Sequence, residues 1–265
     1  WRLFSYTNTS PFTGGEVSEI DTVRQKPEDF IWKHVKATES WCAFAKDSGY
    51  AIGLIMPGCK AWLGGFSGQR NQGGPHDTPT SYLAPLYSEH IDHNIVYDYT
   101  FTVMLGTVEE IRKQALAMRD DSAYRVRFEK TREHWQLIDA RDTGFPIRNG
   151  LKITPTNKTA SLVSPVMVLD PETSKTVTVK ATYRLKDQER KNIELVWTPG
   201  TSPKDLSAGG ISLPIVNDGQ EHDYVFALNQ KPAWVKSIGH IAIKLCGGAS
   251  TKEGDLIEVT AIDLQ

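Results

Sequence analysis

The residues between His93 and Val103 alternate along the chain with a period of two. One face of this stretch carries His93, Ile95, Tyr97, Tyr99, Phe101 and Val103, and the other carries Asn94, Val96, Asp98, Thr100 and Thr102. Successive side chains of a β-strand point to opposite faces of its sheet. The alternation therefore predicts a half-buried strand in an antiparallel sheet.

Three shorter strands are predicted upstream, over residues 40–45, 50–56 and 60–66. Residues 46–49 join the first two as a hairpin, because Gly49 can adopt the positive φ that tight turns need. In this hairpin Cys42 pairs with a residue near Leu54. That register disfavours a disulfide between Cys42 and Cys59.

One helix is predicted, over residues 108–119. Thr107 and Glu110 have the spacing of a capping box, in which each side chain binds the other residue's backbone N–H. Ile111, Ala115 and Met118 then recur at helical spacing. The helix follows directly on the strand that ends near Val103.

The pattern changes after residue 150, where short predicted strands follow one another with frequent turns. They cover residues 163–168, 176–183, 193–197, 211–216, 223–228, 238–245 and 256–262. Many short strands at even spacing are typical of a sandwich or jelly roll. The turn-rich residues 139–150 predict a connection between two domains. We therefore predict an all-β chain with two domains, residues 1–147 and 148–265.

Composition narrows the possible functions. The 265 residues carry a net charge of -2, which does not favour nucleic acid as a partner. No apolar run reaches the roughly 18 residues that cross a bilayer. The chain begins at Trp1, so we expect a processed chain or part of a larger protein. It lacks the common nucleotide-binding, zinc-protease and α/β-hydrolase motifs.

A polar cluster at the start of the alternating stretch contains Glu89, Asp92 and His93. A carboxylate beside an imidazole can act as general acid and base, or can orient the imidazole. The alternative is a buried, hydrogen-bonded group that stabilises the start of the strand. We favour this structural interpretation and keep catalysis open.

Aromatic residues near this cluster suggest a sugar ligand, because a sugar ring has apolar faces and a hydroxyl rim. The candidates are Trp62, Tyr82 and Tyr87, with Arg70 and His76 in the long loop of residues 67–80. A loop of this length is often functional, and a plain excursion is the alternative. In the second domain Trp234 follows Pro232, and we expect its indole to be exposed. Aromatic residues at strand spacing can equally belong to the core.

Acidic residues near the C-terminus raise the question of a metal. Carboxylate oxygens of this region could bind a structural calcium ion, and a plain acidic edge is the favoured alternative; the residues are Glu253, Asp255, Glu258 and Asp263. No cysteine and histidine spacing fits zinc. We expect no other cofactor.

Two sets of residues carry a resemblance to known families. Thr38-Glu-Ser-Trp-Cys-Ala-Phe44, Gly64-Gly-Phe66, Tyr82-Leu-Ala-Pro85 and Glu89-His-Ile-Asp-His93 resemble large secreted bacterial proteins of polysaccharide-degrading systems, of the glycoside hydrolase type. The resemblance implies part of an antiparallel super-sandwich of the galactose-mutarotase type. It also implies that the remaining N-terminal part of the same protein precedes Trp1 and is a partner of this chain.

The second set resembles jelly-roll modules related to carbohydrate-binding modules. It comprises Glu194-Leu-Val-Trp197, Asp218-Gly-Gln-Glu-His222, Pro232-Ala-Trp234 and Gly254-Asp-Leu-Ile-Glu258. Here the chain departs from the pattern at several positions, among them Glu221, Lys236, Lys244, Cys246 and Thr260. The first domain keeps its pattern better, so we expect it to dominate recognition.

These observations lead to one leading function and two alternatives. We predict recognition of a polysaccharide or oligosaccharide within a secreted, periplasmic or cell-surface protein. The first alternative is a glycoside hydrolase or polysaccharide lyase whose site includes Glu89, Asp92 and His93. The second is a structural β-sandwich scaffold.

Overall fold

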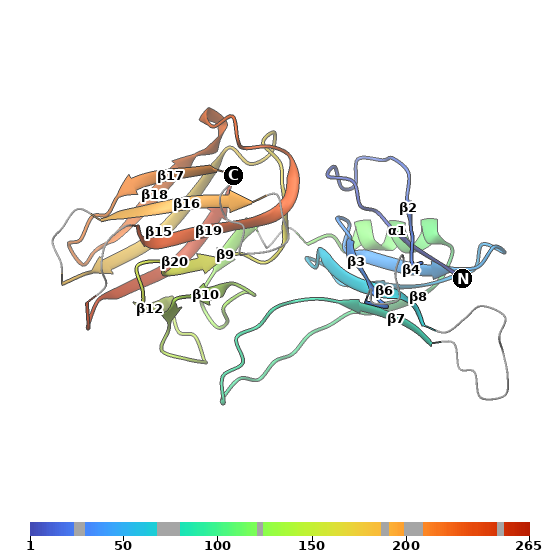
Figure 1. Ribbon diagram of the computed structural model, residues 1–265, viewed down its shortest axis with the longest axis horizontal. Coiled ribbons are helices and arrows are strands. Elements are labelled where there is room, and N and C mark those ends of the chain that lie inside the picture. The colour runs from blue at the N-terminus through green and yellow to red at the C-terminus, as the bar shows by residue number, and fades with distance from the viewer. Residues whose placement is uncertain (24–29, 68–79, 121–123, 187–190, 199–208, 248–251) are drawn as a thin grey trace. The chain divides into compact units, whose positions relative to one another are not determined.

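The computed structural model describes residues 1–23, 30–67, 80–120, 124–186, 191–198, 209–247 and 252–265. The chain forms two compact units, residues 1–87 with 98–120 and residues 88–97 with 121–265 (Figure 1). The described residues build four antiparallel sheets and one α-helix, which confirms the predicted all-β class. The first unit holds α1 and the second is a β-sandwich.

A five-stranded sheet forms the middle layer of the first unit. Its strand order is β2-β1-β4-β5-β8, and the strands are β1 (Arg2–Ser5), β2 (Ser18–Ile20), β4 (Trp41–Ala45), β5 (Ala51–Ile55) and β8 (Thr102–Gly106). The predicted hairpin is confirmed, and Cys42 lies opposite Leu54 as its register requires. All three cysteines are buried free thiols: Cys42, Cys59 and Cys246.

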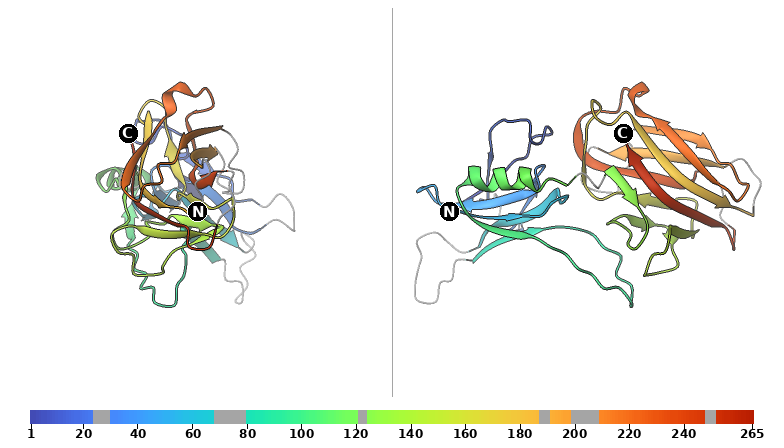
Figure 2. Two further views of the ribbon diagram at one scale, coloured as in Figure 1. Left: turned by 90° about the vertical axis from the view of Figure 1, so that its left-hand side faces the viewer. Right: turned by 180° about the vertical axis from the view of Figure 1, so that it is seen from behind.

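Helix α1 (Val108–Ala117) covers one face of this sheet (Figure 1 and Figure 2). The predicted capping box is present: the Glu110 N–H donates to Thr107 Oγ1 at 3.2 Å, and the Thr107 N–H donates to Glu110 Oε2 at 2.8 Å. The helix packs closely because Gly53 of β5 lacks a side chain. A Cβ at Gly53 would lie 2.7 Å from Cγ2 of Ile111.

A three-stranded sheet covers the opposite face. Its strands, in order, are β3 (Lys33–Lys36), β6 (Ala61–Ser67) and β7 (Thr80–Pro85). The apolar layer between the two sheets includes Leu3, Val35, Cys42, Phe44 and Trp62. The first unit is therefore a helix, a large sheet and a small sheet in three layers.

The second unit stacks two six-stranded sheets around one core. One sheet contains β10 (Gln136–Ile138), β13 (Ser161–Val163), β14 (Met167–Leu169), β16 (Asn192–Thr198), β17 (Gly209–Pro214) and β19 (Ser237–Gly247). The other contains β9 (Arg125–Arg127), β11 (Ala140–Arg141), β12 (Leu151–Pro155), β15 (Thr176–Arg184), β18 (Glu221–Ala227) and β20 (Leu256–Leu264). A short 3₁₀ helix, η3 (Leu228–Gln230), follows β18.

The division between the units differs from the predicted boundary at residues 147 and 148. β10 pairs with β13, and β9 pairs with β20 near the C-terminus. Residues 121–147 therefore belong to the second unit, and so do residues 88–97. The turn-rich residues 139–150 connect strands of one sandwich.

The predicted strand over residues 93–103 is wrong for most of its length. β8 begins only at Thr102, because β5 offers five partner residues and these pair with 102–106. Several apolar residues of the alternating face are exposed, among them Tyr97, Tyr99, Phe101 and Val103. The alternating apolar side chains of this stretch thus lie at the surface. Within the described part of the chain, none of the helices has the length and apolar character needed to span a membrane.

Candidate functional site

The structure separates the residues that the sequence grouped as one site. Trp62, Tyr82 and Tyr87 lie in the first unit, whereas the polar cluster of residues 89–93 and Trp234 lie in the second. Arg70 and His76 lie outside the described residues.

Asp92 is part of an ion-pair network around Arg132. The Arg132 side chain is 3% exposed. Its Nη2 donates to Asp92 Oδ2 at 2.7 Å, and its Nε and Nη2 donate to the Asp142 carboxylate at 2.7 and 2.8 Å. The backbone N–H of Phe145 also donates to Asp92 Oδ2, at 2.9 Å. The network fastens residues 88–97 to the second unit.

These contacts fix the charge state of Asp92. The hydrogen bond from Arg132 lowers the pKa of the Asp92 carboxyl, and the Phe145 N–H adds to this effect. The hydrogen bonds that Arg132 donates to both carboxylates hold its pKa above the ordinary value, although burial opposes them. Asp92 is therefore ionised at neutral pH and has no proton to give as a general acid.

The other two residues of the cluster, Glu89 and His93, differ from Asp92 and from each other in burial and in contacts. The Glu89 side chain is 13% exposed, and its Oε1 contacts Nδ1 of His134. His134 and its neighbour Glu133 both have positive φ, 61° and 50°, in a tight turn. His93 is exposed, so the core-facing position expected for it is wrong. Glu89 thus lies against the His134 imidazole, while Asp92 Oδ1 lies 3.8 Å from Nε2 of His90.

Trp62 is a core residue, which corrects its predicted place at an open cleft. Its side chain is fully buried, and the indole Nε1–H donates to the Cys59 carbonyl at 3.1 Å. It faces inward because its strand β6 lies over the five-stranded sheet. Tyr87 packs partly buried against the same core.

Trp234 is also buried, at 5% exposure, so its expected exposure is wrong. Its Nε1–H donates to the Ser174 carbonyl at 3.0 Å, and its ring meets Trp197 edge to face with centroids 5.3 Å apart. The turn after η3 brings the indole inward: the Trp234 N–H donates to the Lys231 carbonyl at 2.9 Å. A position after Pro232 did not place the side chain in solvent.

Tyr82 lies on an outer face, beside an aromatic residue that the sequence did not mark. It is 41% exposed, and its ring stacks on Trp32 with centroids 5.2 Å apart and an interplanar angle of 29°. Trp32 directly precedes β3, and Tyr82 lies in β7 opposite Gly65 of β6. We call the surface formed by Trp32 and Tyr82 the aromatic platform.

Gly65, which lies beside the Trp32 ring, has a φ of 151°, a conformation that residues with a side chain rarely adopt. A Cβ there would lie 3.6 Å from Cε3 of Trp32, so the indole lies against the glycine backbone. The next row of the same face holds His34, Leu63 and Ala84, and His34 is exposed. The platform thus joins an aromatic surface to a polar side chain.

Two of the acidic residues considered as calcium ligands, Asp255 and Asp263, have other partners. Asp255 accepts backbone N–H groups from Lys186 and Lys252 and lies 3.6 Å from Lys191 Nζ. Asp263 pairs with Arg127 at 2.8 Å. Over the described ranges, no group of three histidine, cysteine, aspartate or glutamate side chains is placed to hold a metal ion.

Sequence reasoning missed Trp32, Arg132, Asp142 and His134. The pair Gly64-Gly65 inside a predicted strand was a usable signal for Trp32, since glycine in a strand often marks a close approach by another group. Arg132 gave no comparable signal, because its partner Asp92 lies 40 residues away in the sequence.

Comparisons with known proteins give no family assignment. The chain matches no protein family and no curated protein sequence. A cleaved adhesin domain of Lys-gingipain from Porphyromonas gingivalis W83 is 9% identical, with a TM-score of 0.36, over 53% of this chain and 96% of that one. An arabinoxylan arabinofuranohydrolase of glycoside hydrolase family 43 from Bacillus subtilis is 10% identical, with a TM-score of 0.35, over 84% of this chain and 53% of that one.

A third solved structure is described as CBM4. It is 11% identical, with a TM-score of 0.33, over 55% of this chain and 99% of that one. At these identities and TM-scores, the likeness carries no conclusion about what the chain binds.

Proposed function

We propose that this chain recognises a polysaccharide or oligosaccharide and that the aromatic platform holds a sugar ring. The observation that carries the proposal is the exposed Tyr82 ring stacked on Trp32. Tyrosine and tryptophan combine an apolar ring with a polar group. A sugar needs both, because its ring faces are apolar and its edge carries hydroxyls.

The platform is held in place before any ligand arrives. Trp32 covers part of the Tyr82 ring, and the β6–β7 ladder fixes the Tyr82 backbone. A ring that is already ordered loses little conformational entropy on binding. His34 in the adjacent row offers hydrogen bonds to sugar hydroxyls. The site thus lies in the first unit, where we expect recognition to be dominant.

Catalysis is the second candidate, because Glu89 and His134 form a partly buried carboxylate–imidazole pair beside a strained turn. Strained backbone is concentrated at functional sites. We rank this candidate lower, because Asp92 is held by Arg132 and His93 is exposed. The scaffold alternative predicts no glycan binding by either unit. Secretion, as part of a glycan-degrading system, belongs to the same proposal.

The first test is a survey of the intact chain against neutral and acidic polysaccharides in native affinity gels. The polysaccharide that retards the chain is then used in calorimetric titrations of Tyr82→Ala and Trp32→Ala. Each variant removes a stacking ring, so we expect Kd to rise at least about tenfold, which corresponds to about 1.4 kcal/mol.

Tyr99→Ala is the matched control, because Tyr99 is a more exposed tyrosine of the same unit, at 59%. It should bind like the wild type. Loss of binding in Tyr99→Ala with retention in Tyr82→Ala would move the site away from the platform. Failure of the wild-type chain to bind any polysaccharide would favour the scaffold. Release of reducing sugar that Glu89→Gln abolishes would favour catalysis.

A further inference from the structure

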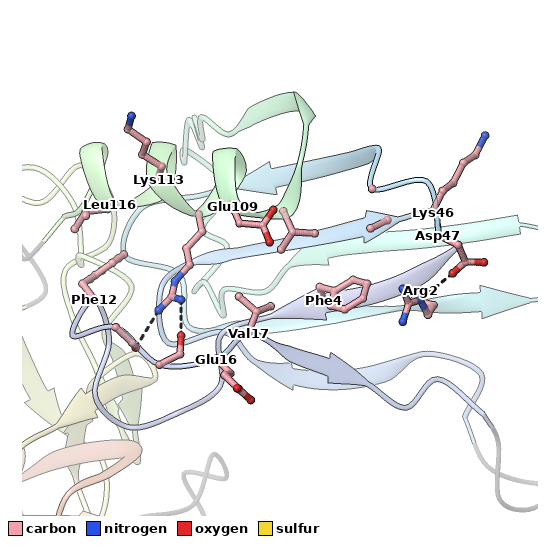
Figure 3. Close-up of a pocket in the computed structure, with 16 residues that line it drawn as sticks. Arg2, Phe4, Phe12, Glu16, Val17, Lys46, Asp47, Glu109, Lys113 and Leu116 are labelled. Atoms are coloured by element: carbon pink, nitrogen blue, oxygen red, sulfur yellow. Dashed lines mark hydrogen bonds and ion pairs between the residues drawn. The ribbon is translucent and has the colours of Figure 1, made fainter.

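A groove lies on the helix side of the first unit, on the layer opposite the aromatic platform. Its volume is about 830 Å³, and its walls are α1 and the loop of residues 12–17. Figure 3 shows Phe4 and Val17 beneath Glu109 and Lys113 of the helix. We call it the helix groove.

The helix groove exists because α1 covers only part of the five-stranded sheet. Ile111 and Ala115 pack with Trp41 and Ala43 of β4. The β1 side of the sheet extends beyond the helix, and Phe4 there is half-buried. The guanidinium of Arg2 lies over the Phe4 ring, 5.2 Å from its centroid. The floor of the groove is thus an aromatic ring with a cation on it.

The loop wall of the helix groove is held by a buried carboxylate. The Glu39 side chain is completely buried and accepts two hydrogen bonds from Arg112, at 2.7 and 2.8 Å. It also accepts the Trp41 indole N–H at 3.1 Å and the backbone N–H of Phe12 at 2.8 Å. A single carboxylate therefore joins the sheet, the helix and the loop.

The carbonyl groups of the loop turn toward these donors. Arg112 donates to the carbonyls of Gly14 at 3.2 Å and Gly15 at 2.7 Å. The Tyr6 hydroxyl contacts the carbonyls of Ser10 and Gly14, each at 2.9 Å. The loop is therefore rigid before a ligand binds.

Phe12 shows that this loop holds strain. Its φ is 58°, which is unusual for a residue with a bulky side chain. Such strain persists where surrounding contacts enforce it, and it is concentrated at binding and catalytic sites. Here the contact between the Phe12 N–H and Glu39 enforces it, and the Phe12 side chain lines the helix groove.

The charges around the helix groove nearly balance. Its cations are Arg2, Lys46, Arg112 and Lys113, and its anions are Glu16, Asp47 and Glu109. Arg112 pairs with Glu39 and Arg2 with Glu19, neither of which lines the groove, so two cations remain against three anions. A rim without excess positive charge gives no net attraction to a polyanion. It supplies both donors and acceptors, which is what the hydroxyls of an uncharged sugar require.

We propose that the helix groove is a second binding site, for a neutral oligosaccharide segment that lies against Phe4 and Phe12. This inference rests on the proposed function and makes the first unit bivalent, with one site on each outer layer. Two sites on one rigid unit can engage two chains of a polysaccharide, or two parts of one chain, and so raise avidity without new contacts.

The test uses a neutral oligosaccharide prepared from a polysaccharide that retards the wild-type chain. Phe12→Gly removes the ring but keeps the N–H that Glu39 accepts, and glycine adopts positive φ readily. Calorimetry of the wild type should give two bound oligosaccharides per chain. Phe12→Gly and Glu109→Ala should each weaken the groove site at least about tenfold, and Gln114→Ala, an exposed helix residue that does not line the groove, should not.

Further measurements separate this inference from the proposed function. Tyr82→Ala should retain the groove site alone, and affinity there should change little between about 0.05 and 0.5 M salt. A single site lost in Tyr82→Ala and unchanged in Phe12→Gly would overturn the groove while leaving the platform. A single site that is lost in Phe12→Gly and unchanged in Tyr82→Ala would overturn the platform while leaving the groove. No binding by the folded wild-type chain would refute both sites.

Discussion

In the second unit, Trp234, which the sequence suggested as an exposed sugar-binding residue, lies in a core where aromatic side chains meet edge to face. Trp197 and Trp234 cross at 84°, and Tyr183 and Tyr224 at 83°. In the first unit, Trp32 and Tyr82 stack at 29° on the outer face of the small sheet. Similar residue types thus take a packing role in one unit and an accessible position in the other.

The difference follows from how each unit covers its sheets. The second unit closes one core between two large sheets, so indoles on the inner faces of the strands have no route to solvent. In the first unit the small sheet covers one face of the large sheet. The outer face of the small sheet has no further layer among the described residues of that unit. Accessibility is therefore a property of the layer, and residue type alone does not predict it.

The largest expected effect is that of Trp234→Ala on the stability of the second unit. The indole is 5% exposed and hydrogen-bonded to Ser174, so its removal leaves a cavity and an unpaired carbonyl. We expect a loss of about 3–5 kcal/mol in the free energy of unfolding, measured in urea. Val235→Ala is the control, because Val235 is 51% exposed, and it should cost less than about 0.5 kcal/mol. A stable Trp234→Ala that no longer binds glycan would reverse the comparison between the units.

The next effect is the pH dependence that Asp92 gives the second unit. Because the pKa of Asp92 is lowered in the folded chain, mainly by Arg132, its ionised form stabilises the fold above the ordinary aspartate value of about 3.9. This stability is lost as the pH falls through the lower folded pKa. Asp92→Asn should cost about 1.5–3 kcal/mol at pH 7, and the difference from wild type should shrink on acidification.

Asp47→Asn is the control for this titration, because the Asp47 side chain is 95% exposed. Its free energy of unfolding should match that of the wild type at every pH. If Asp92→Asn lost no stability at neutral pH, the Arg132 network would not be what fastens residues 88–97 to the second unit.

The local features of the fold could be predicted from the sequence. The Thr107 capping box and the pairing of Cys42 with Leu54 depend on residues close together in the chain. Most strands after residue 150 were predicted for the same reason, although β12 was missed and the predicted strand at 163–168 is two short strands, β13 and β14. These elements depend on periodicity and turn chemistry within a few residues.

Burial and site assembly could not be predicted, because they depend on residues far apart in the chain. Trp62 reads as an exposed aromatic until the large sheet beneath β6 is known. Tyr82 was identified, but its partner Trp32 precedes a strand for which no prediction was made. The strand predicted over residues 93–103 is wrong for the opposite reason: apolar side chains that were expected to be buried are exposed. A period of two indicates alternating faces, but it does not say which face a second layer covers.

A smaller effect is expected from Glu89→Gln, which keeps the shape of the side chain and removes its charge. Glu89 contacts the His134 ring, and both side chains are partly exposed, at 13% and 35%. We expect a loss of about 0.5–1.5 kcal/mol, measured by urea unfolding, and unchanged glycan affinity in calorimetry. Unchanged stability together with abolished glycan turnover would instead favour the catalytic alternative.

The smallest effect is expected from His93→Ala. The alternating pattern places this imidazole on the core face, where its loss would leave a buried partner unsatisfied at a cost of about 1–3 kcal/mol. The structure exposes His93, and its neighbour Asp92 carries the contacts to Arg132. Because surface substitutions usually change stability by less than about 0.5 kcal/mol, urea unfolding of His93→Ala should match the wild type. A loss as large as that of Asp92→Asn would show that residues 88–97 pack more deeply, and the expected contrast between these adjacent residues would be wrong.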